Sequence, residues 1–432
     1  MYDLVIEDAT IVSGQGRVVA DIGIRKGKIA FVGARAPGRA KLKISAIGKF
    51  IMPGIVDMGV RLGAPGLTAA ECWETETRAA VSSGVTTLIE LPDSVPLSRT
   101  AKSISSKRKL AREHSRANFG FWAQATSKNL DKLTTLREKG VLGIWIDLAA
   151  KDDGALTRPQ LVDLLGSYKG VISIMAEDPA LLADAHRTFA GEADPLDNQV
   201  HPPEAASRGV EYVLELVKET GRAIHLMGLS TAAELHLLDP LRGDLPISVG
   251  TSPNHLFLNC ENPGDFKHRP PLREELDRRS LWTALKRQRI DAIASHHTGY
   301  TKEELVGNYW ERNVGLPGLE TSFPLMMAAV HHGRAGLERM VELLSEGPAS
   351  IMGLSKKGAI KRGYDADLLL FTEGQLEVLE REHLIGRSGW SPFVGRELAG
   401  KPEFVLVGGE IVAKRGKITN DNVRGKEVTT LK

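Results

Sequence analysis

The chain of 432 residues has only two cysteines, Cys72 and Cys260, which lie far apart and lack CxxC spacing. This excludes a disulfide scaffold and a thiolate zinc site, and it fits a reducing compartment. The net charge is only +2, so no global field indicates nucleic acid or an acidic membrane as a partner. The sequence also lacks a signal-peptide pattern and any apolar run near the roughly 18 residues of a membrane span. We therefore expect a soluble cytoplasmic protein.

The middle of the chain repeats one pattern eight times. Hydrophobic residues make up 42% of the sequence and charged residues 25%, as in a globular protein with a sizeable core. Short β-rich segments, separated mostly by longer helical stretches, lie at 54–58, 86–91, 119–124, 142–147, 170–175, 222–227, 245–250 and 290–295. Eight strand-then-helix repeats predict an α/β fold, a (β/α)8 TIM barrel.

The two ends of the chain have a different pattern. Short alternating runs broken by glycine turns predict a small β-layer over 1–52, and further strand-like runs lie at 367–371, 404–407 and 410–413. Neither end has enough strands to bury a face alone, so we expect both to form one small β-sandwich domain. The predicted boundaries are 1–52 and 356–420 for the sandwich, 53–355 for the barrel and 421–432 for a mobile tail.

Six motifs resemble, in order, those of cyclic amidohydrolases, closest to dihydroorotases and allantoinases. They lie at 52–57 (MPGIVD), 83–87 with 92–96 (SGVTT and PDSVP), 229–231 (LST), 270–273 (PPLR), 315–321 (GLPGLET) and 363–368 (GYDADL). The resemblance implies a barrel with a β-sandwich built from both termini. It also implies hydrolysis of a cyclic amide by one or two divalent metals, which lower the pKa of a bound water and polarise the carbonyl.

All six metal-binding positions that the resemblance implies are substituted. The HxH pair after strand one falls on Gly59 and Arg61, the carboxylated lysine of strand four on Trp145, the histidines of strands five and six on Met175 and Gly228, and the aspartate of strand eight on His296. Positions implied in dihydroorotate recognition hold Gly63, Asp93 and Arg269 instead. Without its ligands a metal has no reason to stay, so we expect no zinc cofactor and no metal-dependent dihydroorotase activity.

Several polar residues remain that we expect near the barrel mouth. They would bind a polar ligand or pair with one another as a salt-bridged plug, and they are Asp57, Arg61, Asp93, His255, Arg269, His296 and His297. His297 matches a histidine of the family, whereas His296 is new and is a candidate general base. We expect His225 to be structural, on the opposite strand face from Gly228. The basic stretch 102–116 is expected to be a solvated outer helix, not a nucleic-acid surface.

Two functions fit these features. The first is a non-catalytic, dihydroorotase-like pseudoenzyme that acts by binding in pyrimidine biosynthesis. For it, the resemblance implies a homo-oligomer and a scaffold for aspartate transcarbamoylase or a catalytic homologue, favoured by the sequence SHH at 295–297 and by SPFVG at 391–395. The second is a metal-independent hydrolase with a rebuilt site for a cyclic amide, imide or ureide, which requires an open, ligand-sized pocket.

Overall fold

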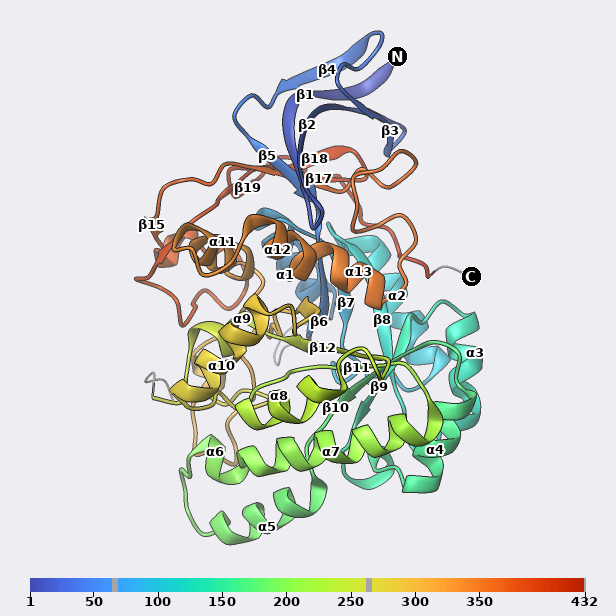
Figure 1. Ribbon diagram of the computed structural model, residues 1–432, viewed down its shortest axis with the longest axis vertical. Helices are drawn as coiled ribbons and strands as arrows, with labels where there is room; N and C mark the ends of the chain where they lie inside the picture. The colour runs from blue at the N-terminus through green and yellow to red at the C-terminus, as the bar shows by residue number, and fades with distance from the viewer. Residues whose placement is uncertain (64–68, 262–265, 431–432) are drawn as a thin grey trace.

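An eight-stranded parallel sheet forms the centre of the protein (Figure 1). The computed structural model describes residues 1–63, 69–261 and 266–430. The strands are β6 (Ile55–Val60), β7 (Val85–Glu90), β8 (Asn118–Gln124), β9 (Gly143–Asp147), β10 (Val171–Met175), β11 (Ile224–Leu226), β12 (Ile247–Thr251) and β13 (Ala292–Ile293). A parallel bridge between Arg61 and Thr298 links the first strand to the segment after the last. The predicted TIM barrel is confirmed.

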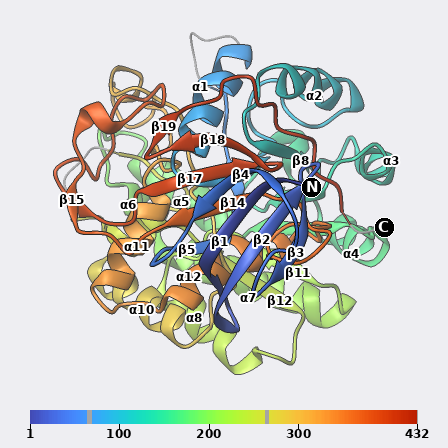
Figure 2. The same ribbon diagram turned by 90° about the horizontal axis from the view of Figure 1, so that it is seen from above.

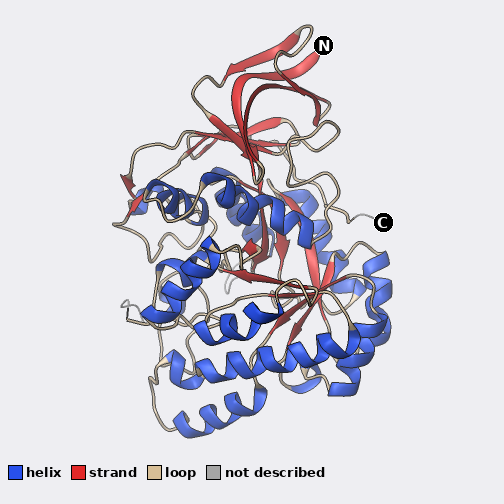
Figure 3. Ribbon diagram, viewed as in Figure 1, coloured by secondary structure: helices blue, strands red, loops and turns tan. Residues whose placement is uncertain are grey.

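Helices surround this barrel (Figure 3). They are α1 (Ala69–Ser82), α2 (Ala101–His114), α3 (Leu133–Glu138), α4 (Arg158–Ser167), α5 (Pro179–Phe189), α6 (Asp197–Val200), α7 (Pro203–Thr220), α8 (Ala232–Leu238), α9 (Pro253–Phe257) and α10 (Glu275–Lys286). In α7, Val210, Val213 and Val217 recur at helical spacing and are buried, and Gly221 ends the helix at a φ of 62°. None of the helices in the described part of the chain is both long and apolar enough to cross a membrane.

The barrel interior is filled by apolar side chains. Because neighbouring residues of a strand point to opposite faces, alternate residues face inward and the others face the helices. Met58, Trp145, Met175 and Met227 belong to one buried cluster, which is separate from the larger cluster beneath the helices. The centre of the barrel is therefore a packed core.

Both ends of the chain contribute to a second, nine-stranded mixed sheet, which lies above the barrel (Figures 1 and 2). Its strands are β1 (Tyr2–Ser13), β2 (Gly16–Arg25), β3 (Lys28–Gly33), β4 (Ala40–Ser45), β5 (Phe50–Pro53), β14 (Leu368–Phe371), β17 (Pro402–Val407), β18 (Glu410–Lys414) and β19 (Lys417–Ile418). The antiparallel pair of β5 and β14 joins the two ends of the chain. A domain built from both termini is thus confirmed, and its strands hydrogen-bond as one sheet. A separate hairpin pairs β15 (Glu377–Val378) with β16 (Glu397–Leu398).

Three short helices lie between this sheet and the barrel (Figure 1). They are α11 (Ser322–His331), α12 (Leu337–Val341) and α13 (Gly347–Ile351), with a π-helical turn at 342–346 before α13. A Cβ atom at Gly347 would lie only 2.1 Å from the carbonyl oxygen of Asp291. Only glycine therefore lets α13 approach the barrel so closely.

Residues 421–430 are held against the barrel. Residues 421–432 were expected to be mobile, but 421–430 run past the start of β8, and 431–432 lie outside the described residues. There the amide of Phe119 donates to the carbonyl of Lys426 at 3.0 Å, and the Glu427 carboxylate lies 2.6 Å from Nε of Arg108. A Cβ at Gly425 would lie 1.7 Å from the carbonyl oxygen of Ala117, so the contact requires glycine. The sequence indicated only a polar segment and gave no sign of these partners.

Candidate functional site

The ring of His296 fills the space between two of the six implied ligand positions. A Cβ at Gly59 would lie 3.2 Å from Cδ2 of His296, and a Cβ at Gly228 would lie 3.2 Å from Cε1 of the same ring. His296 is 3% exposed and has a φ of 50°, a backbone conformation that costs energy in a non-glycine residue. His296 stands where the resemblance implies an aspartate. Its ring therefore lies where the side chains of the two implied histidines, at positions 59 and 228, would begin.

Trp145 and Met175 occupy two further implied ligand positions, on β9 and β10. Both side chains belong to the apolar cluster inside the barrel and are at most 5% exposed. The indole nitrogen of Trp145 has no hydrogen-bond partner among the described residues. An indole N–H only donates, so Trp145 offers no lone pair to a cation.

His296 lies within a group of three buried imidazoles. It stacks on His268 with ring centroids 6.0 Å apart, and the edge of His255 lies near both rings. His255 contacts the Ser252 hydroxyl and the Pro270 carbonyl. Burial lowers the pKa of His296 to about 3 and that of His268 to about 4, and it holds the pKa of His255 well below its usual range. All three are therefore neutral at pH 7.

His297 points away from this group. Its Nε2 atom lies 2.8 Å from Oε2 of Glu76 on α1, and its Nδ1 accepts from the backbone amide of Gly318 at 3.2 Å. The His297 and Glu76 side chains are both almost fully buried. His296 and His297 thus diverge, as two neighbours at a strand end do.

Asp57 lies beneath the mouth. Its carboxylate accepts from the backbone amides of Gly59 at 3.1 Å and Ser295 at 3.2 Å, and it is 3% exposed. Burial raises the pKa of Asp57, although these hydrogen bonds act to lower it. Asp57 therefore ties β6 to the end of β13 and is not open to a ligand.

Arg61 and Asp93 form an ion pair at the mouth, with Nε of Arg61 2.7 Å from Oδ2 of Asp93. Asp147 follows nearby at the end of β9. Burial raises the pKa of Asp147 to about 6, and the negative charges of Glu177 and Asp93 add to this rise. The Arg61 charge and a hydrogen bond from a backbone amide act to lower the same pKa. Asp147 was missed in the sequence, where a lone acid at a strand end carries no specific signal.

Arg269 binds a partner that the sequence did not indicate. Its Nη1 donates to Oδ1 of Asp197 at 2.7 Å, and its Nη2 lies 3.2 Å from the hydroxyl of Tyr309. Burial alone would raise the pKa of Asp197, but Arg269 and Tyr309 outweigh it and lower that pKa. The cation is thus neutralised. Tyr309 and Asp197 come from segments more than 100 residues apart, which no spacing rule connects.

Lys107 of α2 points inward, although the basic stretch 102–116 was expected to be solvated. Its Nζ lies 3.0 Å from Oε2 of Glu90 at the end of β7 and donates to the carbonyl of Ser94 at 2.9 Å. Burial raises the pKa of Glu90, and Lys107 opposes that rise. Arg116, which follows the end of α2, is also buried, at 4% exposed, and lies 3.4 Å from the Glu74 carboxylate, whereas Lys102 and Lys109 on α2 are exposed as expected.

The residues at the six positions do not fit a divalent cation. Glycine has no side-chain donor, the Arg61 guanidinium is a cation, and Trp145 has no lone pair to give. A thioether such as that of Met175 is a soft ligand, unsuited to a hard metal site. Across residues 1–63, 69–261 and 266–430, no group of three or more histidine, cysteine, aspartate or glutamate residues is placed to hold a metal.

Comparison with known proteins gives matches over nearly the whole chain. The family described as "Amidohydrolase family" matches residues 306–412. A dihydroorotase of Pyrococcus furiosus is 30% identical over 403 residues, which cover 92% of this chain and 89% of the relative. An allantoinase of Streptomyces avermitilis is 28% identical over 98% of both chains. The solved structure of an L-hydantoinase (dihydropyrimidinase) from Arthrobacter aurescens has a TM-score of 0.91 at 26% identity and covers 99% of this chain and 100% of its own.

Proposed function

The chain belongs to the amidohydrolase family, and on that premise we propose that it is a non-catalytic member that has lost the metal centre and acts by binding. The observation that carries the proposal is the His296 ring, which lies within 3.2 Å of the Cβ positions of both Gly59 and Gly228. Two histidines at those positions would overlap it. The buried side chains of Trp145 and Met175 stand at two further implied ligand positions and offer no hard donor, which supports the proposed loss of the metal centre.

The polar residues at the mouth also favour binding over catalysis. A general base works best with a pKa near the working pH. Burial lowers the pKa of His296 to about 3, so it is a weak base at pH 7. Arg61 and Arg269 are each paired with an aspartate, so neither is a free clamp for a substrate anion. Aspartates of the same protein therefore already balance the charges of both arginines.

As a binding protein we expect this chain to form a homo-oligomer and to serve as a cytoplasmic scaffold in pyrimidine biosynthesis. The first partner to test is the one that the sequence resemblance implies, aspartate transcarbamoylase or a catalytic homologue, and the chain is similar to relatives named dihydroorotase. Sedimentation velocity of the two purified proteins, alone and mixed at about 10 μM, measures this directly because a specific complex of micromolar affinity is populated there. A faster boundary containing both proteins supports the scaffold, and two unchanged boundaries contradict this partner.

A second candidate is a metal-independent hydrolase with a rebuilt site, and Asp147 is the observation that favours it. A half-buried carboxyl group with a pKa of about 6 suits acid–base chemistry near neutral pH. Hydrolysis of dihydroorotate, hydantoin and allantoin is measured with excess EDTA for the wild type and for Asp147→Asn. Turnover that persists in EDTA and is lost in the variant establishes this function and refutes the non-catalytic proposal. The absence of turnover in both proteins refutes the rebuilt site.

A further inference from the structure

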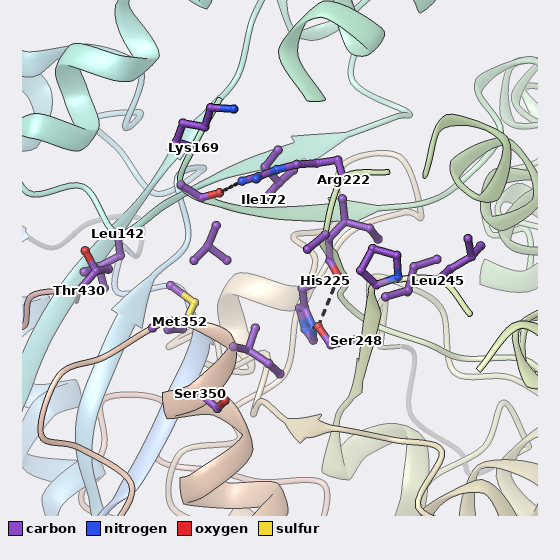
Figure 4. Close-up of a pocket in the computed structure, with 18 of the residues that line it drawn as sticks. Leu142, Lys169, Ile172, Arg222, His225, Leu245, Ser248, Ser350, Met352 and Thr430 are labelled. Atoms are coloured by element: carbon purple, nitrogen blue, oxygen red, sulfur yellow. Dashed lines mark hydrogen bonds between the residues drawn. The ribbon is translucent and has the colours of Figure 1, made fainter. Parts of the chain in front are cut away.

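A cavity of about 660 Å³ lies at the opposite end of the barrel from His296. It is lined where three neighbouring strands begin, at Ile172 of β10, His225 of β11 and Ser248 of β12, and by Ser350 and Met352 at the end of α13 (Figure 4). Barrel enzymes place their chemistry at the other end, where strands finish. The cavity is therefore separate from the site described above, and its volume suits a small organic molecule.

The charge around this cavity is of one sign. Arg137, Lys169, Arg222 and Arg242 line it, and the described residues that line it include no aspartate or glutamate. Arg242 is neutralised because both of its terminal nitrogens bind the carboxylate of Asp291. The ion pairs found among the described residues include none that involves Arg137, Lys169 or Arg222. Three cations thus face one cavity without a counter-charge.

Two buried nitrogens at this cavity also lack a partner. His225 is 1% exposed, and its Nδ1 lies 3.0 Å from the Ser248 hydroxyl, but its Nε2 has no hydrogen-bond partner within the part of the chain that the structure describes. The same holds for Nε of Arg222, whose Nη2 donates to the carbonyl of Gly170. Burial lowers the pKa of Arg222 and the charge of Arg137 lowers it further, whereas Tyr168 acts to raise it. Buried polar atoms normally have partners, and the Nε–H group of Arg222 is a donor that lacks an acceptor.

The remaining wall of the cavity is apolar. Leu142, Ile172, Leu245, Ile351 and Met352 contribute to it. In Figure 4, Lys169 and Arg222 lie along one side, and Met352 and Ser350 lie across from them. A free inorganic ion would satisfy the cations but would leave the apolar wall against water. The two walls together suit a molecule with an anionic group and an apolar body.

We propose that this cavity is a binding site for a small organic anion, a phosphate monoester or a carboxylate with an apolar body. The anionic group binds between Arg222 and Lys169, and the apolar body lies against Ile172 and Met352. The site is independent of the proposed loss of catalysis, because it shares no residue with the barrel mouth. Its occupation cross-links the starts of β10, β11 and β12 to α13, so it also stabilises the barrel.

Isothermal titration calorimetry of the full-length protein tests the site with four probes. Phenyl phosphate and phenylacetate carry both parts of the expected ligand, inorganic phosphate lacks the apolar body, and benzyl alcohol lacks the charge. Lys169→Met removes an exposed cation for which the described residues show no side-chain hydrogen bond or ion pair, and Arg222→Met removes a half-buried cation. Lys218→Met, an exposed lysine on α7 that does not line the cavity, is the matched control.

One equivalent of phenyl phosphate or phenylacetate is expected to bind with a Kd below about 1 mM, and whichever binds more tightly identifies the anionic group. Arg222→Met should weaken that binding roughly tenfold and Lys169→Met roughly threefold, because a charge-assisted contact to a half-buried cation is less screened by water than one to an exposed cation. Lys218→Met should leave it unchanged. The proposal is overturned if neither organic anion binds, if inorganic phosphate or benzyl alcohol binds as tightly, or if Lys169→Met and Lys218→Met behave alike.

Discussion

Replacing Gly59 by alanine tests whether His296 fills the space of the implied ligands. The new Cβ would lie 3.1 Å from Cβ of Ala294 and 3.2 Å from Cδ2 of His296, whereas carbon atoms prefer about 3.5–4.0 Å. The ring cannot retreat freely, because it stacks on His268 and lies against Gly228. Overpacking of this kind costs about 1–3 kcal/mol, and the lost backbone freedom of the unfolded chain returns about 0.4–1 kcal/mol. We expect the free energy of unfolding to fall by about 1–2 kcal/mol.

Urea unfolding followed by tryptophan fluorescence measures this change, with Trp122 and Trp145 as probes inside the barrel. Gly63→Ala is the control, because its Cβ would meet no atom closer than 3.4 Å. The cost of Gly59→Ala should fall by about 1 kcal/mol when His296 is already alanine, and the part that remains comes from the 3.1 Å contact with Cβ of Ala294. The reasoning is refuted if Gly59→Ala costs no more than Gly63→Ala, or costs the same in both backgrounds.

Three further predictions use other parts of the site. Lys107→Met should lower the free energy of unfolding by about 3 kcal/mol, since it leaves the buried Glu90 unpaired. The control variant Lys109→Met, at an exposed position of the same helix, should change it by less than about 0.5 kcal/mol. Equal losses for the two variants in urea unfolding would contradict the ion pair. The raised pKa of Asp147, about 6 against an ordinary 3.8, means that the unfolded chain ionises first and stability is lost as pH rises between these values. The free energy of unfolding of Asp147→Asn should therefore rise by about 2 kcal/mol relative to that of the wild type between pH 4 and pH 7, and an equal difference at both pH values would contradict the raised pKa. Removing metal with EDTA should leave the melting temperature unchanged within about 1 °C, whereas a fall of several degrees would show that a bound metal stabilises the fold.

The fold followed from periodicity and order along the chain. Each of the eight predicted strands lies within a few residues of an observed one, because buried parallel strands read as short apolar runs between turns. The pairing of β5 with β14 was expected because neither end of the chain has enough strands to bury one face of a sheet by itself. The docking of residues 421–430 did not follow, because it depends on single contacts such as that of Glu427 with Arg108, which polar composition does not encode.

The site was less accessible to prediction than the fold. The resemblance placed Gly59 and Trp145 on the first and fourth barrel strands and Gly228 and His296 just after the sixth and eighth, where the structure also finds them. Contacts between distant segments were not predictable, such as that of Arg269 with Asp197. His268 was missed although it immediately precedes Arg269 in a recognised motif, because a lone histidine beside a motif carries no directional information. Lys107 was misplaced because its neighbours in sequence are solvated and only its position on the helix turns it inward.

The most direct test of the proposed loss of the metal centre is the zinc content of protein purified without chelator, measured again after incubation with excess zinc and dialysis. Fewer than about 0.1 equivalents per chain in both samples is the predicted result, since the implied ligand positions offer almost no donors. About one or more tightly held equivalents per chain would contradict it and would mean that other side chains, with His296, build a metal site.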